Sequence, residues 1–258
     1  MHLQVEKVNR EDLEIKVKQM YKDVAEHPEK KYHFEMGRDL AEHLGYPVTL
    51  LNQLPTAAIE SFAGVGYHFG LAEIKKGDNI VDLGSGSGMD AFCAGLLTGI
   101  SGEVIGIDMT SEQLEKAERL RVESKITNVI FRKAYIEELP VVSRSIDVAI
   151  SNGVINLTSD KSKAFIEAAR VLKRGGKLAL SDIVSAIKLP DSISCNPTNW
   201  AACIGGAMQE DEYLNNIKEA GFEIINVVDN PYSFIANSAT GATKDYGIKS
   251  ISVLAIKK

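Results

Sequence analysis

The chain has 258 residues, 45% of them hydrophobic and 25% charged, which is the balance of a globular protein with a substantial buried core. Its formal net charge is −6 with the basic residues dispersed, which argues against nucleic acid as a partner because phosphate neutralisation needs a concentrated basic face. Three cysteines, Cys93, Cys195 and Cys203, are too few for a disulfide framework and fit a reducing compartment. No apolar run reaches the roughly 18 residues of a membrane helix, and the first residues are charged. We therefore predict a cytoplasmic protein without membrane insertion.

The first part of the chain is predicted to be helical. Apolar residues recur at spacings of three and four between about residues 11 and 44, and Gly45 and Pro47 then interrupt the pattern. A second helix is predicted over residues 50–62, and a glycine-rich stretch, residues 63–70, follows it. We interpret residues 1–72 as an N-terminal helical cap with a loop that leads into the core.

From residue 78 onward, short apolar runs alternate with helical stretches, which is typical of a parallel sheet flanked by helices. The predicted strands are 79–83, 103–108, 129–133, 146–151 and 177–182. The helices between them are 89–98, 111–124 and 161–172. A helix over 210–220, a strand over 222–228, a loop over 229–249 and a terminal strand over 250–256 complete the prediction.

A glycine-rich turn, Gly84-Ser85-Gly86-Ser87-Gly88, joins the first predicted strand to a helix. Glycine is needed where the backbone takes positive φ or approaches a ligand closely, and such a turn suits a dinucleotide as well as other nucleosides. Two neighbours favour S-adenosylmethionine. Asp82 would repel a pyrophosphate but attract the ammonium of a methionine moiety, and Met89 stands where the dinucleotide fingerprint needs glycine or alanine. An NAD(P)-linked dehydrogenase remains the alternative from another enzyme class.

A second carboxylate, Asp108, ends the second predicted strand 20 residues after Gly88. A carboxylate at this place accepts hydrogen bonds from both ribose hydroxyls of a bound nucleoside. Its neighbour Met109 can lie on one face of an adenine ring.

Five segments resemble class I S-adenosylmethionine-dependent methyltransferases in order and spacing. They are residues 82–88, Asp108-Met109, Phe131 with 137–140, 145–148 and 170–176. The resemblance runs from about Leu54 to the end and is strongest to the arsenite methyltransferases and their quinone-methyltransferase-like relatives. Residues 151–157, 181–183 and 203–207 are similar to the arsenite branch specifically.

The resemblance implies an α/β, Rossmann-like fold, with an N-terminal helical cap and with residues 73–258 as the S-adenosylmethionine-binding domain. It implies a seven-stranded, mostly parallel sheet with flanking helices, whose last strand is antiparallel and inserted beside the sixth. The cofactor-binding residues it implies are Asp82, Gly84, Ser85, Gly86, Gly88, Asp108, Met109, Ile136, Glu137 and Asn152. Within this set Ile136 and Glu137 face the adenine edge, and Asn152 lies near the sulfonium. Tyr135 departs from the pattern, because relatives usually carry Asp or Glu there.

A second departure concerns the acceptor. Arsenite methyltransferases present three cysteines to arsenic, a soft metalloid that binds thiolates. Here Val65 and Gly153 stand at two of those positions, and only Cys203 remains. We therefore predict methyl transfer to a small molecule other than arsenite. The alternatives are a thiol site rebuilt with Cys195 and a relative that binds the cofactor without catalysis.

The residues that contact the acceptor are predicted from the glycine-rich stretch 63–70 and from the segments after the fourth and fifth predicted strands. The candidates are Tyr67, His68, Gly153, Asn156, Trp200 and Cys203, with Tyr21 and Tyr246 more weakly supported. His68 has a pKa suited to a general base but is flanked by aromatic residues and can simply pack, and Trp200 is either a packing anchor or a pocket wall. No catalytic residue is assigned. No metal site is expected, because His27, His33 and His43 are irregularly spaced. The atom methylated and the oligomeric state stay open.

Overall fold

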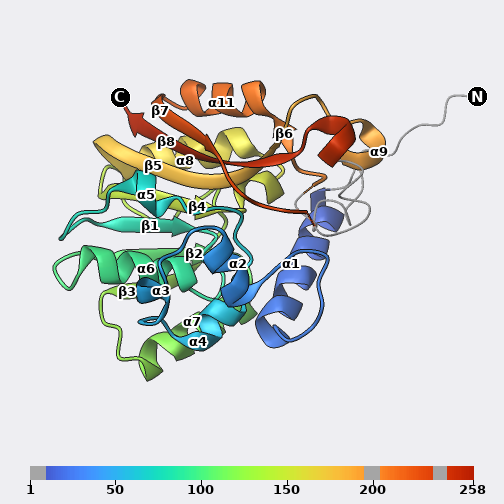
Figure 1. Cartoon of the computed structure of the whole chain (residues 1–258). Helices are drawn as coiled ribbons and strands as arrows, with labels where there is room; N and C mark the ends of the chain where they lie inside the picture. The colour runs from blue at the N-terminus through green and yellow to red at the C-terminus, as the bar shows by residue number, and fades with distance from the viewer. Residues whose placement is uncertain (1–9, 195–203, 235–242) are drawn as a thin grey trace, which may run out of the picture.

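The computed structural model describes residues 10–194, 204–234 and 243–258, and a single mixed sheet forms its centre (Figure 1). The sheet order is β3-β2-β1-β4-β5-β8-β7. Its strands are β1 (Ile80–Leu83), β2 (Val104–Asp108), β3 (Val129–Lys133), β4 (Ile146–Asn152), β5 (Leu172–Ser185), β6 (Met208–Gln209), β7 (Phe222–Asp229) and β8 (Lys249–Lys257). β1 to β5 pair in parallel, whereas β8 runs antiparallel between β5 and β7.

The predicted fold class is confirmed, but the predicted number of strands is wrong. The sheet has eight strands rather than seven, because β6 pairs in parallel with the end of β5 through Val184–Met208 and Ser185–Gln209. A strand of two residues has no alternation of apolar and polar side chains, so the sequence gives no signal for it.

Helices cover both faces of the sheet (Figure 1). They are α1 (Arg10–Glu26), α2 (Gly37–His43), α3 (Val48–Leu51), α4 (Thr56–Glu60), α5 (Phe69–Ala72), α6 (Met89–Thr98), α7 (Ser111–Glu123), α8 (Lys161–Val171), α9 (Asp191–Ser194) and α11 (Glu210–Glu219), with the 3-10 turn η1 (Ile155–Leu157). Successive strand residues point to opposite faces. Val81 and Leu83 therefore pack with α8 and α11, whereas Ile80 packs with α2, α4 and α6. Within the described part of the chain, no helix is long and apolar enough to cross a bilayer.

The N-terminal helices are shorter than predicted. The pattern over 11–44 divides into α1 and α2, with Pro28 in the non-helical stretch between them. The pattern over 50–62 divides into α3 and α4, and Pro47 and Pro55 occupy their N-cap positions. Proline fixes its own φ and lacks an N–H donor, so it begins helices but does not continue them. The prolines therefore set these boundaries.

β5 begins earlier than predicted. The helix before it ends at Val171, and the strand begins at Leu172 rather than at residue 177. The β4–β5 register shifts from Ile146–Leu172 to Val148–Lys177, so residues 173–176 bulge out of the ladder, with Gly175 at φ 75°. Glycine permits this conformation without steric cost.

One buried carboxylate ties three elements together in the half of the fold that carries β5. Asp182 is 1% exposed and accepts hydrogen bonds from the Tyr213 hydroxyl of α11 (2.7 Å) and the Asn156 amide of η1 (2.9 Å). Burial raises the pKa of Asp182 to about 6. Lys161 donates to the Asn156 and Thr158 carbonyls at 3.1 and 3.0 Å, and burial lowers its pKa to about 8.

Replacing Tyr213→Phe is expected to destabilise the protein by about 1–3 kcal/mol at pH 7.5, because an ionised buried carboxylate then loses a charge-assisted donor. The loss should be smaller at pH 5. The pKa of Asp182 is about 6 in the folded state and about 3.8 in the unfolded chain. At pH 5 the folded carboxyl is therefore largely protonated, and the Tyr213 hydroxyl stabilises it less than it stabilises the ionised form. Urea unfolding at both pH values measures this.

The matched control is Tyr32→Phe, in which the lost hydroxyl donates to the exposed carboxylate Asp23 at 2.9 Å. An equal loss of stability at pH 5 and pH 7.5 in Tyr213→Phe would contradict the assignment of the effect to the ionised form of Asp182.

Candidate functional site

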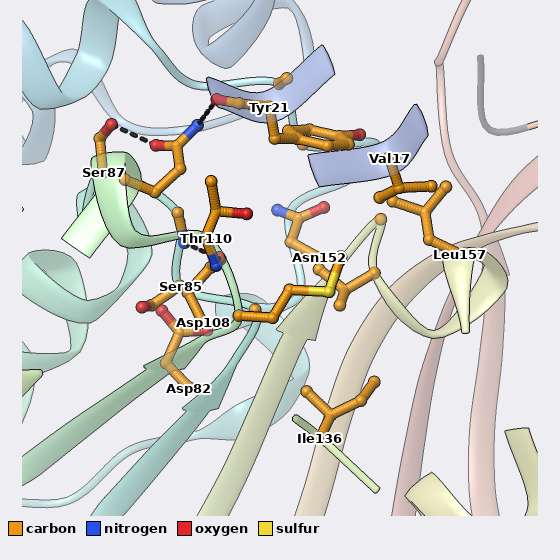
Figure 2. A pocket seen from close by; sticks show the side chains of 18 of the residues that line it. Val17, Tyr21, Asp82, Ser85, Ser87, Asp108, Thr110, Ile136, Asn152 and Leu157 are labelled. Atoms are coloured by element: carbon orange, nitrogen blue, oxygen red, sulfur yellow. Dashed lines mark hydrogen bonds between the residues drawn. The ribbon is translucent and has the colours of Figure 1, made fainter. Parts of the chain in front are cut away.

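A pocket of about 1230 Å³, part of it open to solvent, lies at the carboxyl ends of β1, β2 and β4 (Figure 2). The chain reverses its direction of travel across the sheet at β1, which pairs with β2 on one side and β4 on the other. Ligands of open α/β sheets bind at such a switch point, where the loops on either side diverge. Nearly all of the cofactor-binding residues predicted from the sequence line this pocket.

The glycine-rich turn forms one wall. Gly84 and Gly88 have φ angles of 76° and 94°, which side chains other than glycine rarely adopt. A Cβ at Gly84 would collide with Val154, and one at Gly88 would lie 2.8 Å from Phe131. The backbone of the turn is therefore packed against the core on one side and open to the pocket on the other, where Gly84, Ser85 and Gly86 line it.

Asp82 is the most unusual group in the pocket wall. It is 2% exposed, and its Oδ2 atom has no hydrogen-bond partner within the described structure. Burial raises the pKa of Asp82 well above its usual value, and the nearby carboxylates Asp90 and Asp108 raise it further. A buried acceptor of this kind costs free energy unless a donor or cation reaches it, so the site is built for a positively charged ligand group.

The whole pocket is acidic. Five carboxylates line it, and its described wall contains no Lys, Arg or His side chain. The five are Glu14, Asp82, Asp90, Asp108 and Glu137. A dinucleotide would place a pyrophosphate in this field without a single basic partner, whereas a ligand with an ammonium or sulfonium would be attracted.

Asp108 ends β2, as predicted, and its carboxylate is already oriented by the backbone. It accepts hydrogen bonds from the Gly86 and Thr110 amides at 2.9 and 2.8 Å. Burial raises the pKa of Asp108, and these two bonds act in the opposite direction. Its neighbour Met109 also lines the pocket, so this edge presents one carboxylate and one thioether to a ligand.

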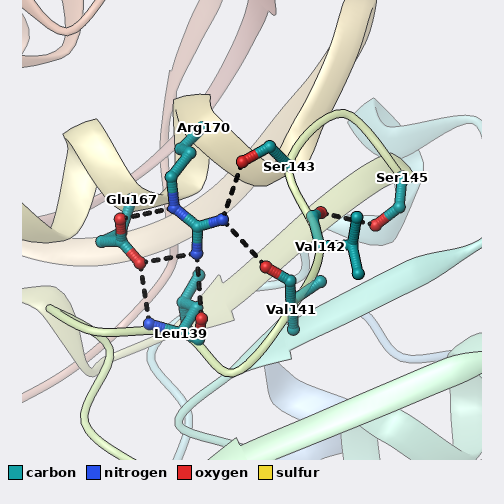
Figure 3. Close-up of polar contacts among 7 residues, drawn as sticks. All are labelled: Leu139, Val141, Val142, Ser143, Ser145, Glu167 and Arg170. Atoms are coloured by element: carbon teal, nitrogen blue, oxygen red, sulfur yellow. Dashed lines mark hydrogen bonds and ion pairs between the residues drawn. The ribbon is translucent and has the colours of Figure 1, made fainter.

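Ile136 and Glu137 line the pocket after β3. The Glu137 carboxylate accepts a hydrogen bond from Thr158 and is 8% exposed. The loop that follows is held by Arg170 at the end of α8 (Figure 3), which donates to the Leu139 and Val141 carbonyls at 2.9 Å each. The Glu167 carboxylate pairs with the same guanidinium and accepts the Leu139 amide at 2.8 Å. Arg170 thus fixes the chain on which Ile136 and Glu137 lie.

α1 closes the pocket from the N-terminal side, with Leu13, Glu14, Val17 and Tyr21 in its wall. The sequence predicted a cap here but gave a signal for Tyr21 alone. The Tyr135 hydroxyl donates to Glu14 at 2.5 Å, and Lys18 donates to both groups. Tyr135, the departure from the family pattern, therefore attaches α1 to the loop after β3.

Further contacts attach α1 to α7. Lys22 pairs with Glu112 at 2.7 Å, and Gln113 links the Ser87 hydroxyl of the glycine-rich turn to the Tyr21 carbonyl (Figure 2). Lys116 donates to the Ala25 carbonyl at 3.0 Å. The helix is thus fastened along its length beside the pocket.

The acceptor-side predictions have mixed outcomes. Of the candidates that the structure describes, Gly153 lines the pocket, whereas Tyr67, His68 and Asn156 do not. Tyr67 packs on Tyr46 and Phe69, and Asn156 is buried with its amide bonded to Asp182. Trp200, Cys203 and Cys195 lie outside the described residues.

His68 is fully buried and its ring lies 4.5 Å from that of Phe69. Burial lowers the pKa of His68, so its ring is neutral at pH 7. Because the ring is fully buried and does not line the pocket, the structure favours the packing interpretation of His68 over a role as general base.

Residues 74–221 match the family described as "Methyltransferase domain". The chain belongs to this family. Its resemblance to the class I S-adenosylmethionine-dependent methyltransferases is thereby confirmed.

Several of the sequence relatives are arsenite methyltransferases. The chain is 35% identical to that of Halobacterium salinarum over 207 residues, which is 80% of this chain and 53% of the relative. It is 40% identical to that of Homo sapiens over 152 residues, 55% of this chain and 40% of the relative. The chain thus spans about half the length of the curated relatives it matches.

Among solved structures, the arsenic(III) S-adenosylmethionine methyltransferase of Chlamydomonas reinhardtii is similar with a TM-score of 0.64 and 26% identity, over 87% of this chain and 75% of that one. A geranyl diphosphate methyltransferase is similar with a TM-score of 0.65 over 95% and 99%, but at 18% identity it supports the fold alone.

Asp82→Asn is expected to weaken S-adenosylmethionine binding about 10- to 100-fold, because the ligand's ammonium loses a charged partner. The same change should stabilise the free protein at pH 7, because burial and the neighbouring carboxylates Asp90 and Asp108 disfavour the ionised form of Asp82. The pKa of Asp82 is raised, so ionising this group costs free energy in the folded state. Asp82→Asn avoids this cost at pH 7. At pH 4 the wild-type group is protonated, and the variant then gains no stability in this way.

Calorimetric titration and urea unfolding measure the two effects, with the exposed Asp39→Asn on α2 as control. If Asp82→Asn bound the cofactor as tightly as the wild type, the assignment of Asp82 to the cationic part of the ligand would fail.

Proposed function

We propose that the protein transfers a methyl group from S-adenosylmethionine to a small organic acceptor that carries no carboxylate or phosphate, and that arsenite is not its preferred substrate. Support for the donor comes from the buried carboxylates Asp82, Asp90 and Asp108 of the pocket wall, of which Asp82 has an oxygen without a hydrogen-bond partner in the described structure. Support for the acceptor comes from the residues that stand where thiols are expected. We further propose residues 1–72 as the cap and residues 73–258 as the domain that binds the cofactor.

The pocket fits the donor group by group. Asp82 and the turn formed by Gly84, Ser85, Gly86 and Gly88 would hold the methionine moiety, whose ammonium satisfies the orphaned Asp82 oxygen. Asp108 would hold the ribose hydroxyls. Met109, Ile136 and Glu137 would surround the adenine. S-adenosylmethionine supplies an electrophilic methyl carbon when it is bound, and the protein's own task is to orient that carbon and exclude water from it.

The two positions where arsenite methyltransferases are expected to carry cysteine lie in contact here. A Cβ on Gly153 would be 3.3 Å from Val65 Cγ1, and Val65 is fully buried. The valine side chain thus fills the space that a second thiol would need, and Gly153 has φ 70°, which strains any larger residue. A hydrocarbon side chain cannot coordinate a metalloid. Val65 and Gly153 therefore define the shape of the site but provide no ligand for arsenic.

The other end of the pocket is apolar. Val17 of α1 and Leu157 of η1 lie at the end of the pocket away from Asp82 and Asp108 (Figure 2). Apolar walls favour an acceptor with a hydrocarbon body, and the five carboxylates disfavour one that carries a carboxylate or phosphate. The described pocket wall contains no His or Lys side chain that could take a proton from the acceptor, which favours acceptors that are partly ionised at neutral pH, such as thiols and selenols.

Turnover of labelled S-adenosylmethionine against a panel of thiols, phenols, quinols and arsenite tests this proposal. We expect at least one organic acceptor to be methylated at least about tenfold faster than arsenite, the factor that corresponds to 1.4 kcal/mol of differential transition-state binding. Asp82→Asn serves as the control that the reaction uses this pocket.

Two results would contradict the proposal. Arsenite as the best acceptor would assign the chain a thiol site rebuilt around Cys195 and Cys203. Tight cofactor binding without turnover on any member of the panel would make it a relative that binds the cofactor without catalysis.

A further inference from the structure

Three side chains from distant parts of the sequence meet at the back of the pocket. Tyr46 follows α2, Asp90 is the second residue of α6, and Asn152 ends β4. The Tyr46 hydroxyl donates to Asp90 Oδ1 at 2.6 Å, and Asn152 Nδ2 donates to Asp90 Oδ2 at 3.0 Å. Asp90 is 6% exposed and Tyr46 is 2% exposed. A single carboxylate therefore joins the N-terminal segment to the end of a central strand.

The Asn152 side chain is occupied by the protein itself. Its nitrogen also lies 3.0 Å from the Gly66 carbonyl, and its oxygen accepts the Val65 amide at 2.8 Å. Acceptors on one side and a donor on the other fix the orientation of the amide. Asn152 thus spans the gap between Asp90 and the lead-in loop, which we define as residues 63–68.

The lead-in loop is held closely at this point. A Cβ on Gly64 would lie 2.6 Å from Asn152 Nδ2, and one on Gly66 would lie 2.5 Å from Ser181 Oγ. On the opposite side the Ser250 hydroxyl of β8 donates to the Val65 carbonyl at 2.6 Å. The loop backbone is therefore fixed between Asn152 and Ser250, and Ala63 and Gly64 face the pocket beside Gly153.

Asp90 is an unusual residue at its place in α6. α6 has eight buried residues, and Asp90 is the only charged one among them. Its charge lies near that of Asp82, and no basic side chain in the described pocket wall compensates either group. An apolar residue would remove this repulsion. It could not accept from Tyr46 and Asn152 together, which a carboxylate does because it has two oxygens.

We propose that Asp90 is a positioning residue of the methyl-transfer site, which acts through Asn152 and Tyr46 to fix the lead-in loop against the end of β4. This proposal rests on the proposed function. The loop carries Ala63 and Gly64, and Val65 behind them packs on Gly153, so its position sets the shape of the pocket on the acceptor side. An error of about 1 Å in such a wall is enough to misalign an acceptor for in-line transfer.

The test compares three variants. Tyr46→Phe removes one donor and keeps the charge and shape. Asp90→Asn removes one of the two acceptor oxygens that the Tyr46 hydroxyl and the Asn152 amide use. The exchanged pair Asp90→Asn with Asn152→Asp restores a donor opposite an acceptor between these two positions, but it loses the donor to the Gly66 carbonyl. Tyr32→Phe is the matched control, because its hydroxyl also donates to a carboxylate, Asp23, but away from the pocket.

The first readout is amide hydrogen exchange at Val65 and Gly66, which needs neither cofactor nor acceptor. We expect exchange at Val65 to be about tenfold faster in Tyr46→Phe and in Asp90→Asn, the factor that one ordinary hydrogen bond contributes. The exchanged pair should recover most of the protection at Val65, and Tyr32→Phe should match the wild type. Because Tyr46→Phe is nearly isosteric, it carries the test if Asp90→Asn does not fold.

The second readout separates positioning from cofactor binding. S-adenosylhomocysteine affinity by calorimetry and the KM for S-adenosylmethionine should change less than about threefold in Tyr46→Phe, whereas kcat with an organic acceptor from the panel should fall about tenfold. Unchanged exchange at Val65 in both single variants would overturn the proposal. So would a loss of S-adenosylhomocysteine affinity without a change at Val65, because Asp90 would then serve the cofactor directly. If the wild-type protein bound no S-adenosylhomocysteine, the proposed function would be contradicted. The hydrogen-exchange result would still show whether Asp90 fixes the lead-in loop, because that measurement needs no cofactor.

Discussion

The site is organised by negative charge that the protein does not neutralise. Asp82, Asp90 and Asp108 lie around one pocket because parallel strands β1 and β2 end side by side and α6 begins directly after the glycine-rich turn. Topology alone brings the three carboxylates together. Within a partly dry pocket the repulsion between these carboxylates opposes their ionisation, and together with burial it raises the pKa of Asp82. A positive ligand relieves this repulsion. The same three carboxylates therefore influence both the stability of the fold and the preference for a cationic cofactor.

The cap completes this electrostatic arrangement. α1 adds a further carboxylate, Glu14, to the wall. The same helix also carries Lys18 and Lys22, which form ion pairs with Glu14 and Glu112 at the rim of the pocket. The positive charges lie at the rim, where water screens them, and the interior keeps its negative potential. Tyr135 belongs to the same arrangement, because its hydroxyl contacts the Glu14 carboxylate and the Lys18 amine together. The residue that departs from the family pattern thereby connects the cap to the sheet.

Much of the fold could be predicted because buried parallel strands leave continuous apolar runs that periodicity recognises. β6 could not, since two residues carry no period. The break between α1 and α2 was missed because apolar spacing was given more weight than Pro28. At the site, the glycine-rich turn and Asp108 were found because they occupy fixed positions relative to strands. Asp90 was missed, although a lone charged residue inside the apolar segment 89–98 is a usable signal. Tyr67 and His68 were assigned to the acceptor side by their place in the chain, but their side chains turn into the core.

The Val65–Gly153 contact bears on what the acceptor must supply. The two residues come from different loops and lie in contact. Two cysteines at these positions would be neighbours, but valine and glycine provide no sulfur there. A metalloid needs ligands from the protein, and its reaction is lost when hydrocarbon replaces them. An organic acceptor needs only to be held in line with the methyl carbon, because its nucleophilic atom and the bonds that fix it belong to the same molecule. Under the proposed function, valine and glycine at these positions select a different class of acceptor without requiring any change in the donor site. On the same proposal, the lead-in loop, fixed through Asn152 and Asp90, is the part of the molecule on which acceptor selection depends.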